Sequence, residues 1–365
     1  MKIESINLSN FRNFNKETIV FHPKTTVLVG NNGQGKTNIL ESVYLLSMAR
    51  SFRVKDEKEL IQHGSYLSKI AGLFSDKGVK KQITTIIHDQ GKTILVNKQA
   101  IASIKSFIGE IHTVLFSPSD MTFFDGSPGN RRKFLDSEGS KCSKLFVDAL
   151  YQYTKTQKER NLYLKNENPD STYLDVLDQQ MVTQQIEIIR FREEFIQFLD
   201  DHVTDIYNSL SLENDKVNIV YKTIFDLKIN DREKHIMSVI SESRSRDLMY
   251  RNTHVGIHRD DLDVYLNDHA VDSYASQGQK RLLIIAIKLA LIEYIKKVKM
   301  TTPILLLDDV FSEIDIDKRK QFISLLPTDI QTLITTTDLD DISTMKTIDM
   351  FVYDVVNGRA QRSIK

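Results

Sequence analysis

The chain has 365 residues, about twice the usual length of one domain, so its length favours two structural regions. Hydrophobic residues make up 41% and charged residues 27% of the sequence, which is typical of a globular protein with a sizeable core. Lysine and arginine together number 49, as do aspartate and glutamate. Because the net charge is zero, a nucleic-acid site would have to be a local patch.

Cysteine usage and hydropathy exclude several classes of protein. Cys142 is the single cysteine, which excludes an intramolecular disulfide framework and a zinc site built from cysteines. The N-terminus carries Glu4 where a signal peptide has its apolar core. The most apolar stretch, residues 282–292, is short and interrupted by Lys288. We therefore expect a cytoplasmic protein with no membrane span and no membrane partner.

In chain order, the first third predicts strands and one helix. Residues 1–9 and 17–29 form alternating or β-rich runs, and a glycine-rich loop follows. Residues 36–50 then carry apolar side chains at helical spacing. Short strands separated by turn residues are predicted next at 69–74, 82–89, 93–96 and 114–116.

The middle of the chain predicts long helices. Apolar residues recur at helical spacing from Leu174 to Ile206. An earlier helix, residues 142–166, is expected to pack back on that stripe across a turn at 166–171. The expected structure is a helical hairpin with its own core.

Strand patterns return in the last third of the chain. Residues 304–307 and 332–335 are apolar runs of the kind found in strands buried on both faces of a sheet. We predict an α/β fold whose sheet is built from both chain ends. The N-terminal part of the head is expected to span residues 1–130, an inserted helical arm 131–245, and the C-terminal part of the head 246–365.

Residues 30–37 match the phosphate-loop pattern G-x-x-x-x-G-K-[ST], with a predicted strand before them and a helix after them. Glycines let backbone N–H groups curl around an anion, and the helix N-terminus adds its positive dipole end. Lys36 is expected to reach the phosphates of ATP, and the Thr37 hydroxyl to bind Mg²⁺. The candidate nucleotide-binding residues are Gly30, Asn31, Asn32, Gly33, Gln34, Gly35, Lys36 and Thr37.

Two acids follow the apolar run at 304–307, as in the partner motif of a phosphate loop. Asp308 is expected to hold Mg²⁺, and Asp309 to orient or deprotonate the attacking water. Lys36 and Asp309 are therefore the predicted catalytic residues. The alternative is an acidic turn after a buried strand.

The tetrapeptide Ser276-Gln277-Gly278-Gln279 resembles the signature motif of ABC ATPases and opens a helix predicted from Lys280. In that family the loop binds the γ-phosphate held by the opposite subunit, so the resemblance implies a homodimer on ATP binding. The alternative is an ordinary N-cap serine. Residues 311–315 resemble the family's D-loop, with Ser312 and Asp315 as candidates. No histidine follows the strand at 332–335, where ABC transporters carry a switch histidine, which disfavours a transporter subunit.

Further segments make the resemblance specific. Residues 10–14, Asn-Phe-Arg-Asn-Phe, are similar to the opening of RecF, SMC and Rad50 heads, which adds Arg12 to the nucleotide-binding candidates. Segments similar to those of the RecF family follow in order at 117–120, 126–128, 131–136, 258–262 and 305–313. The resemblance covers residues 1 to 340 or so, and the inserted arm is far shorter than SMC and Rad50 coiled coils.

The sequence departs from the RecF pattern at two positions. Ile257 stands where a proline is expected, and Ser119 where an acid is expected. The second departure leaves Asp120 as the candidate from that loop to complete the Mg²⁺ shell.

The resemblance implies an ABC-type, SMC/Rad50-like ATPase head with mixed sheets and a helical arm. It implies an ATP- and Mg²⁺-dependent homodimer that clamps single-stranded DNA and gapped duplex and hydrolyses ATP slowly. It also implies partnership with RecR and RecO, loading of RecA, and roles in DNA repair, DNA replication and SOS induction.

A basic segment lies between Arg131 and Lys165, where nine lysines and arginines stand against four acids. Basic side chains release counterions from phosphates, and the tyrosines at 151, 153 and 163 could stack on bases. The alternative is a solvated helix face. The candidate DNA contacts are Arg131, Arg132, Lys155, Lys158 and Arg160.

His258, Asp260, Asp261 and Asp263 could form the metal site of a nuclease. They alternate as in a strand, and no further carboxylates follow at matching spacing. A structural salt-bridged turn with Arg259 is the favoured interpretation.

Overall fold

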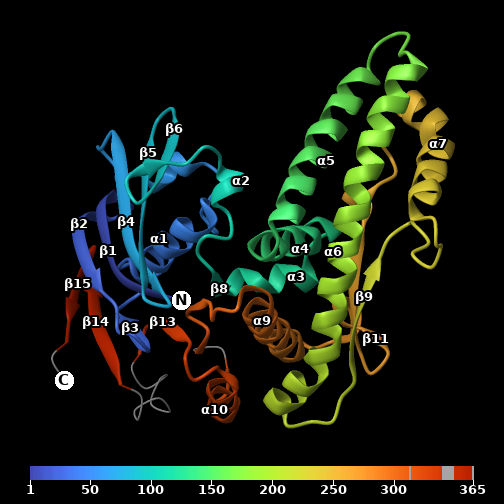
Figure 1. The fold of residues 1–365 in the computed structure, drawn as a ribbon. Coiled ribbons are helices and arrows are strands. Elements are labelled where there is room, and N and C mark those ends of the chain that lie inside the picture. The colour runs from blue at the N-terminus through green and yellow to red at the C-terminus, as the bar shows by residue number, and fades with distance from the viewer. Residues whose placement is uncertain (312–313, 339–348, 364–365) are drawn as a thin grey trace. The chain divides into compact units, whose positions relative to one another are not determined.

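The computed structural model describes residues 1–311, 314–338 and 349–363, and the chain divides into two compact units (Figure 1). Both chain ends belong to the same unit, as the apolar strands of the two ends predicted. Unit 1 contains residues 1–120, 206–213 and 282–365, and unit 2 contains residues 121–205 and 214–281.

One sheet of unit 1 joins strands from both ends of the chain. Its strands are β3 (Thr25–Val29), β8 (Thr113–Phe116), β12 (Ile304–Asp308), β13 (Gln331–Thr336), β14 (Met350–Val356) and β15 (Arg359–Arg362). Their order is β15-β14-β3-β13-β12-β8, and every pair is parallel except β14 with β15. All residues of β12 and β13 are buried, which explains their continuous apolar character.

The second sheet of unit 1 is antiparallel. Its strands are β1 (Lys2–Phe11), β2 (Phe14–Val20), β4 (Leu67–Asp76), β5 (Val79–His88), β6 (Gly91–Val96) and β7 (Gln99–Ala100), in the order β2-β1-β4-β5-β6-β7. The run predicted at 17–29 therefore divides between two sheets. His22 and Pro23 separate the two parts, because a proline has no N–H for a strand ladder and the ring of His22 accepts the N–H of Lys24 at 3.1 Å.

Helix α1 (Lys36–Met48) packs against β8, β12 and β13 of the first sheet and against β4 and β5 of the second (Figure 1). Eleven of its 13 residues are buried, since a helix covered on both sides has no solvent face. It ends at Ala49, whose left-handed backbone (φ +53°) lets its N–H bond to the Leu45 carbonyl. The packing of α1 therefore fixes the preceding loop at the carboxyl end of β3.

The remaining helices of unit 1 are shorter, except for α9. They are η1 (Glu57–Leu60), α2 (Ile104–Phe107), η2 (Pro118–Met121), α10 (Ile316–Leu325) and α9 (Gln277–Lys299), of which residues 282–299 belong to this unit. Lys288 interrupts the apolar stretch of α9, and its ammonium group pairs with Asp120 and bonds to the Leu115 carbonyl. In the described part of the chain, no helix is long and apolar enough to span a bilayer.

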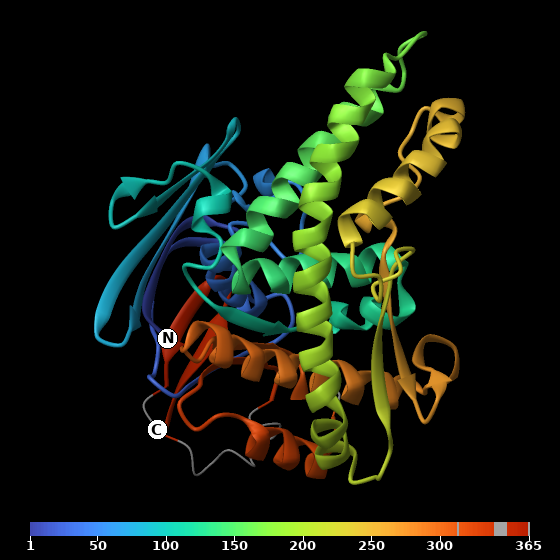
Figure 2. The same ribbon diagram turned by 45° about the vertical axis from the view of Figure 1, so that its right-hand side comes forward.

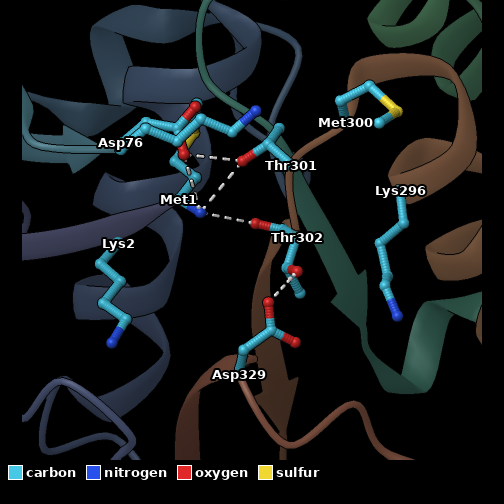
Figure 3. A pocket seen from close by; sticks show the side chains of 9 residues that line it. Met1, Lys2, Asp76, Lys296, Met300, Thr301, Thr302 and Asp329 are labelled. Atoms are coloured by element: carbon cyan, nitrogen blue, oxygen red, sulfur yellow. Dashed lines mark hydrogen bonds and ion pairs between the residues drawn. The ribbon is translucent and has the colours of Figure 1, made fainter.

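The N-terminus is tied to the segment after α9 (Figure 3). The Met1 ammonium group donates to Thr301 Oγ1 at 3.1 Å and to the Thr302 carbonyl at 2.9 Å, and lies 3.2 Å from Asp76. Thr301 donates in turn to Asp76 at 2.8 Å. These bonds connect β1, β4 and the start of β12 at the wall of a cavity of about 390 Å³.

Unit 2 is mainly helical. Its helices are α3 (Thr122–Asp125), α4 (Pro128–Cys142), α5 (Lys144–Tyr163), α6 (Ser171–Ser211, up to residue 205), α7 (Arg232–Tyr250), η3 (Ile257–Arg259) and α8 (Val271–Tyr274). Helices α5 and α6 run side by side (Figure 2), with the rings of Phe146 and Phe191 stacked at 4.2 Å. The predicted apolar stripe from Leu174 is largely buried on α6, which confirms the helical hairpin.

A small antiparallel sheet completes unit 2. Its strands are β9 (Val217–Lys222), β10 (Asp261–Leu266) and β11 (His269–Ala270), in the order β11-β10-β9. Because β10 pairs with β9 along its whole length, residues 246–281 pack with the arm. The boundary of the compact units therefore differs from the one expected at residue 245, since strand pairing depends on a partner that local sequence does not name.

Arg160 lies at the centre of a buried ion-pair network in unit 2. Its side chain is 0% exposed, and its guanidinium contacts Asp178 at 2.6 Å, Asp247 at 2.8 Å and Thr253 at 2.9 Å. These partners come from α6, α7 and the segment after α7. The prediction that Arg160 contacts DNA is therefore corrected, because its positive charge is enclosed by protein.

Replacing Arg160 with methionine is expected to lower the free energy of unfolding by about 3 kcal/mol or more, because Asp178 and Asp247 would stay buried without this cation. Lys158→Met, two positions earlier and exposed, is the control and should change stability by less than about 1 kcal/mol. Chemical denaturation of both variants decides the matter. Equal stabilities would contradict the role assigned to Arg160.

Candidate nucleotide-binding site

The phosphate loop, residues 30–37, connects β3 to α1 as the sequence predicted. Gly35 precedes the helix with φ +116°, and a Cβ there would lie 2.8 Å from the Asn13 amide and 2.9 Å from the Phe14 ring. Only glycine fits this position. Lys36 is buried, and its ammonium group bonds to the carbonyls of Gly30 and of Asn31, the latter at 3.1 Å.

Burial lowers the pKa of Lys36 from its ordinary value, and the nearby carboxylates of Asp309 and Asp308 only partly offset that effect. The lysine is therefore a desolvated cation that lacks full compensation. An anion placed in the loop would supply it, so the loop electrostatics favour a phosphate.

The Thr37 hydroxyl donates a hydrogen bond of 2.8 Å to Asp308 Oδ1, across 271 residues of sequence. Thr335 donates to the same oxygen at 2.9 Å, since β12 and β13 pair with Asp308 opposite Thr335. Burial raises the pKa of Asp308, and both hydroxyl donors oppose the rise. A hydroxyl and a carboxylate oxygen side by side are the hard ligands that suit Mg²⁺.

Asp309 leaves β12 with a left-handed backbone, φ +53°. Its N–H donates to Thr335 Oγ1 at 2.9 Å, so a single threonine holds the main chain of Asp309 and the side chain of Asp308. An αL aspartate is uncommon, and this hydrogen bond stabilises the turn that directs Asp309 out of the strand. Thr335 was not among the predicted site residues.

Arg12 lies beside α1. Its guanidinium makes a two-pronged contact with Glu41 at 2.9 and 2.8 Å and donates to the Glu59 carbonyl at 3.1 Å. Glu41 is fully buried and lies 3.6 Å from Arg53, whose guanidinium donates to Asn38 at 2.7 Å. Arg53 is 42% exposed, and its positive charge partly offsets the burial that raises the pKa of Asp308.

Arg53 was not among the predicted site residues, because no motif surrounds it. It follows the end of α1 in the segment Ser51-Phe52-Arg53, and only the fold returns that segment to Asn38 and Glu41.

Comparison with known proteins gives the family. Residues 2–359 match the family described as RecF/RecN/SMC N terminal domain. The DNA replication and repair protein RecF of Oenococcus oeni is 37% identical over 98% of this chain and 99% of its own length. That of Streptococcus suis (strain 05ZYH33) is 36% identical over the whole of both chains.

This chain belongs to the RecF family.

Solved structures agree on the fold. The recombination mediator protein RecF-ATP in the RecFOR pathway superposes with a TM-score of 0.91 and 30% identity, covering 99% of each chain. An Smc head bound to the C-winged helix domain of ScpA has a TM-score of 0.58 at 15% identity and covers 100% of this chain and 97% of its own, so its likeness concerns the fold alone. The expected SMC/RecF-like ATPase head with mixed sheets is confirmed.

The predicted signature residues form the N-terminus of α9 in unit 2. The Ser276 hydroxyl accepts the Gln279 N–H at 3.2 Å, and the Gln279 side chain accepts the Ser276 N–H at 2.9 Å, which is a capping box. Ser276, Gln277 and Gly278 are exposed. Lys280 anchors the helix start through Asp125 at 2.7 Å.

The two D-loop candidates are Ser312 and Asp315. Ser312 lies outside the described residues. Asp315 is exposed, caps the start of α10 with its carbonyl, and pairs with Lys318 at 3.1 Å. Its contact with a second subunit stays a prediction.

The nine basic residues of 131–165 fall into two groups. Arg131 makes a two-pronged contact with Asp261, Arg132 donates to the Asp260 carbonyl, and Lys141 pairs with Glu138. With Arg160, these four serve the fold of unit 2. The other five are exposed: Lys133, Lys144, Lys155, Lys158 and Lys165.

The tyrosines of the basic segment also divide. Tyr151 is 53% exposed, whereas Tyr153 is 3% exposed and its hydroxyl lies 2.7 Å from His258 Nδ1. Tyr163 packs edge-on against Tyr173 at 4.6 Å. Stacking on a base therefore remains open to Tyr151 and is closed to Tyr153.

The acids near His258 are occupied by ion pairs. Asp260 lies 3.0 Å from Arg192, Asp261 pairs with Arg131, and Asp263 pairs with Lys222. Burial lowers the pKa of His258 to about 4, so the ring is neutral near pH 7. Within the described ranges, no three His, Cys, Asp or Glu side chains gather as metal ligands. The structural interpretation holds, but the cations come from other elements and not from Arg259, which is exposed.

Both departures from the RecF pattern have local explanations. The Ile257 N–H donates to the buried side chain of Gln185 at 3.1 Å, a bond that proline could not make. Ser119 pairs with the Ser117 hydroxyl at 2.7 Å. Asp120, the candidate for the Mg²⁺ shell, instead accepts the Ser117 N–H at 2.8 Å and pairs with Lys288.

Proposed function

We propose that this protein is an ATP-dependent DNA-binding protein of recombinational repair, in which ATP binding closes a homodimer on DNA and slow hydrolysis reopens it. The observation that carries the proposal is the Thr37–Asp308 hydrogen bond, which joins the phosphate loop to the acidic strand end at 2.8 Å. Family membership and the similarity to RecF-ATP structures support it.

The phosphate loop and the residues around it would share the binding of the nucleotide. Backbone N–H groups of residues 30–37 would cradle them, and Lys36 would exchange its carbonyl partners for phosphate oxygens. Mg²⁺, held by Thr37 and Asp308, would neutralise phosphate charge. Asp309 would accept a proton from the attacking water, and Arg12 would contact the nucleotide.

The exposed signature loop supports the dimer. Ser276 uses a lone pair to cap α9, so its hydroxyl proton remains available for a phosphate oxygen of another subunit. The N–H groups of Gln277 and Gly278 at the start of the helix have no intrahelical acceptor, and Gly278 leaves space around them. Gln277 and Gln279 would flank that contact, and the D-loop residues Ser312 and Asp315 would cross the same interface.

The five exposed lysines support a DNA surface on unit 2. Lys144, Lys155 and Lys158 share one face of α5 with the exposed Tyr151, since their spacings of 11 and 3 follow the helical repeat. Single-stranded and gapped duplex DNA are the proposed ligands. Arg131 and Arg132 of α4 are engaged in an ion pair with Asp261 and a hydrogen bond to the Asp260 carbonyl.

The relatives' names place those proteins in DNA replication and repair, and the solved RecF structures in the RecFOR pathway. By extension we propose RecO and RecR as partners, promotion of RecA loading, and support of DNA replication and SOS induction in the cytoplasm. The alternative of a transporter subunit has no switch histidine at 335–338 to support it. The alternative of a nuclease is disfavoured, because Asp260, Asp261 and Asp263, its candidate metal ligands, form ion pairs with basic side chains.

Nucleotide should drive dimerisation through the signature loop. Sedimentation is expected to show monomers without ATP and dimers with it, and Ser276→Arg should keep ATP binding and lose the dimer. Ser273→Arg adds the same charge at an exposed serine three positions away and should still dimerise. Dimers of Ser276→Arg in ATP would argue against this interface.

Binding and hydrolysis should separate at Lys36 and Asp309. Lys36→Ala is expected to lose ATP affinity, dimerisation and DNA retention together. Asp309→Asn should bind ATP normally but hydrolyse it roughly 10²-fold more slowly, because an amide cannot accept the proton. It should also hold DNA longer than wild type. Both ATP turnover and DNA dissociation are measured on one preparation. If Asp309→Asn hydrolyses ATP at the wild-type rate, Asp309 is not the catalytic residue.

The exposed lysines should set the salt dependence of DNA binding. The double variant Lys155→Ala/Lys158→Ala is expected to reduce the slope of log K against log salt by about 1.4–1.8 if both contact phosphates. Lys216→Ala/Lys234→Ala removes the same charge from exposed positions of unit 2 and should keep the slope. An unchanged slope in the first variant would identify the α5 lysines as solvated surface.

A further inference from the structure

The turn between β14 and β15 contacts the phosphate loop. The Asn357 N–H donates to Gln34 Oε1 at 2.7 Å, and the Gly358 N–H donates to the Gln34 carbonyl at 3.2 Å. Asn13 Nδ2 donates to that carbonyl at 2.8 Å. Asn357 and Gly358, more than 320 positions after Gln34 in the sequence, thus bond both its side-chain oxygen and its carbonyl oxygen.

The fit is too close for any side chain at position 358. Asn357 and Gly358 have φ of +47° and +72°, the left-handed pair of a two-residue hairpin turn. A Cβ on the buried Gly358 would lie 2.1 Å from the Asn13 carbonyl oxygen. Gly30, at the other end of the loop, abuts the Val355 carbonyl, which a Cβ would approach to 2.3 Å. The hairpin therefore touches both ends of the loop.

Peptide geometry gives this contact a consequence for the anion cradle. In a trans peptide the C=O and the following N–H point in opposite directions. The Gln34 carbonyl is held toward the hairpin and Asn13, so the Gly35 N–H must point away from them, into the loop that Lys36 also faces. Rotation of this peptide would turn an oxygen toward the phosphate, where a donor is needed.

We propose that the Asn357-Gly358 turn is a positioning element for the phosphate loop, which fixes the Gln34–Gly35 peptide with its N–H toward the nucleotide and so sets nucleotide affinity. The inference rests on the proposed nucleotide binding. Coupling between two sites is reciprocal, so bound nucleotide must also stabilise the hairpin contact. Any ligand or partner that moved the hairpin would change nucleotide affinity.

The test is Gly358→Ala, with Gly78→Ala as a matched control. Gly78 occupies the same place in the β4–β5 hairpin with φ +84°, and a Cβ there meets nothing within 4 Å. Both variants carry the same kind of backbone strain, and only the first disturbs Asn13 and Gln34. Equilibrium titration with a fluorescent ATP analogue should show a Kd raised roughly tenfold in Gly358→Ala, by loss of one well-aimed hydrogen bond to a charged group, and unchanged in Gly78→Ala.

Hydrogen exchange of residues 355–360 supplies a readout that simple destabilisation does not give. Nucleotide should slow their exchange in wild type and in Gly78→Ala but not in Gly358→Ala. If Gly358→Ala does not fold, Gln34→Met replaces it, since that change removes the acceptor of the Asn357 N–H and with it one of the two hydrogen bonds between the turn and Gln34. Kd values and exchange equal to the control in the tested variant would overturn the inference. Failure of the wild type to bind nucleotide would instead overturn the proposed function.

Discussion

The parallel pairing of β3 with β13, and of β13 with β12, is the constraint on which the rest of unit 1 depends. Its register places Val29 opposite Thr336 and Thr335 opposite Asp308, so the carboxyl ends of the three strands share one edge. Parallel neighbours need long connections, and here the connection between β3 and β13 contains all of unit 2. Neither chain end alone carries the site, because one supplies Lys36 and Thr37 and the other supplies Asp308 and Thr335.

The same edge explains why threonines matter as much as the motif residues. Asp308 is buried at the end of an apolar strand, where an unpaired carboxylate is costly. Hydroxyls from Thr37 and Thr335 satisfy one of its oxygens, and the Asp309 N–H closes the network on Thr335. A change at Thr335 would therefore act on both acids at once.

Sequence patterns predicted most strands of unit 1, α1, the helical hairpin and the phosphate loop, because each depends on local spacing. They did not predict α7, β9 or the β14–β15 hairpin, whose stability comes from partners distant in sequence. Helix α7 buries only Ile236, Ile240 and Asp247, so its pattern is faint. Arg53 and Thr335 escaped notice for the same reason: their importance arises from what the fold places beside them.

Arg160 shows how charge counting fails. It lies seven residues after the buried Tyr153 and four after the buried Thr156, so it belongs to the inward face of α5. Lys155 and Lys158 lie on the opposite, exposed face. A helical wheel of α5 places the two groups on opposite faces. The side chains suit these places, since arginine's fork fits buried carboxylates and lysine's strongly hydrated ammonium favours solvent. The net charge of residues 131–165 adds the buried and the exposed cations together, so it does not show which of them can reach DNA.

In the signature loop, the same residues cap a helix and are proposed to bind a phosphate. Capping of α9 uses the Ser276 oxygen as acceptor and the Gln279 amide oxygen as a second acceptor. These bonds use the N–H groups of Ser276 and Gln279 but leave the hydroxyl proton of Ser276 and the N–H groups of Gln277 and Gly278, which are donors of the kind that a phosphate requires. The capping box instead fixes the direction in which those donors point before any partner arrives. A rigid donor set loses less entropy on binding than a mobile one, so the cap itself favours the proposed contact between subunits.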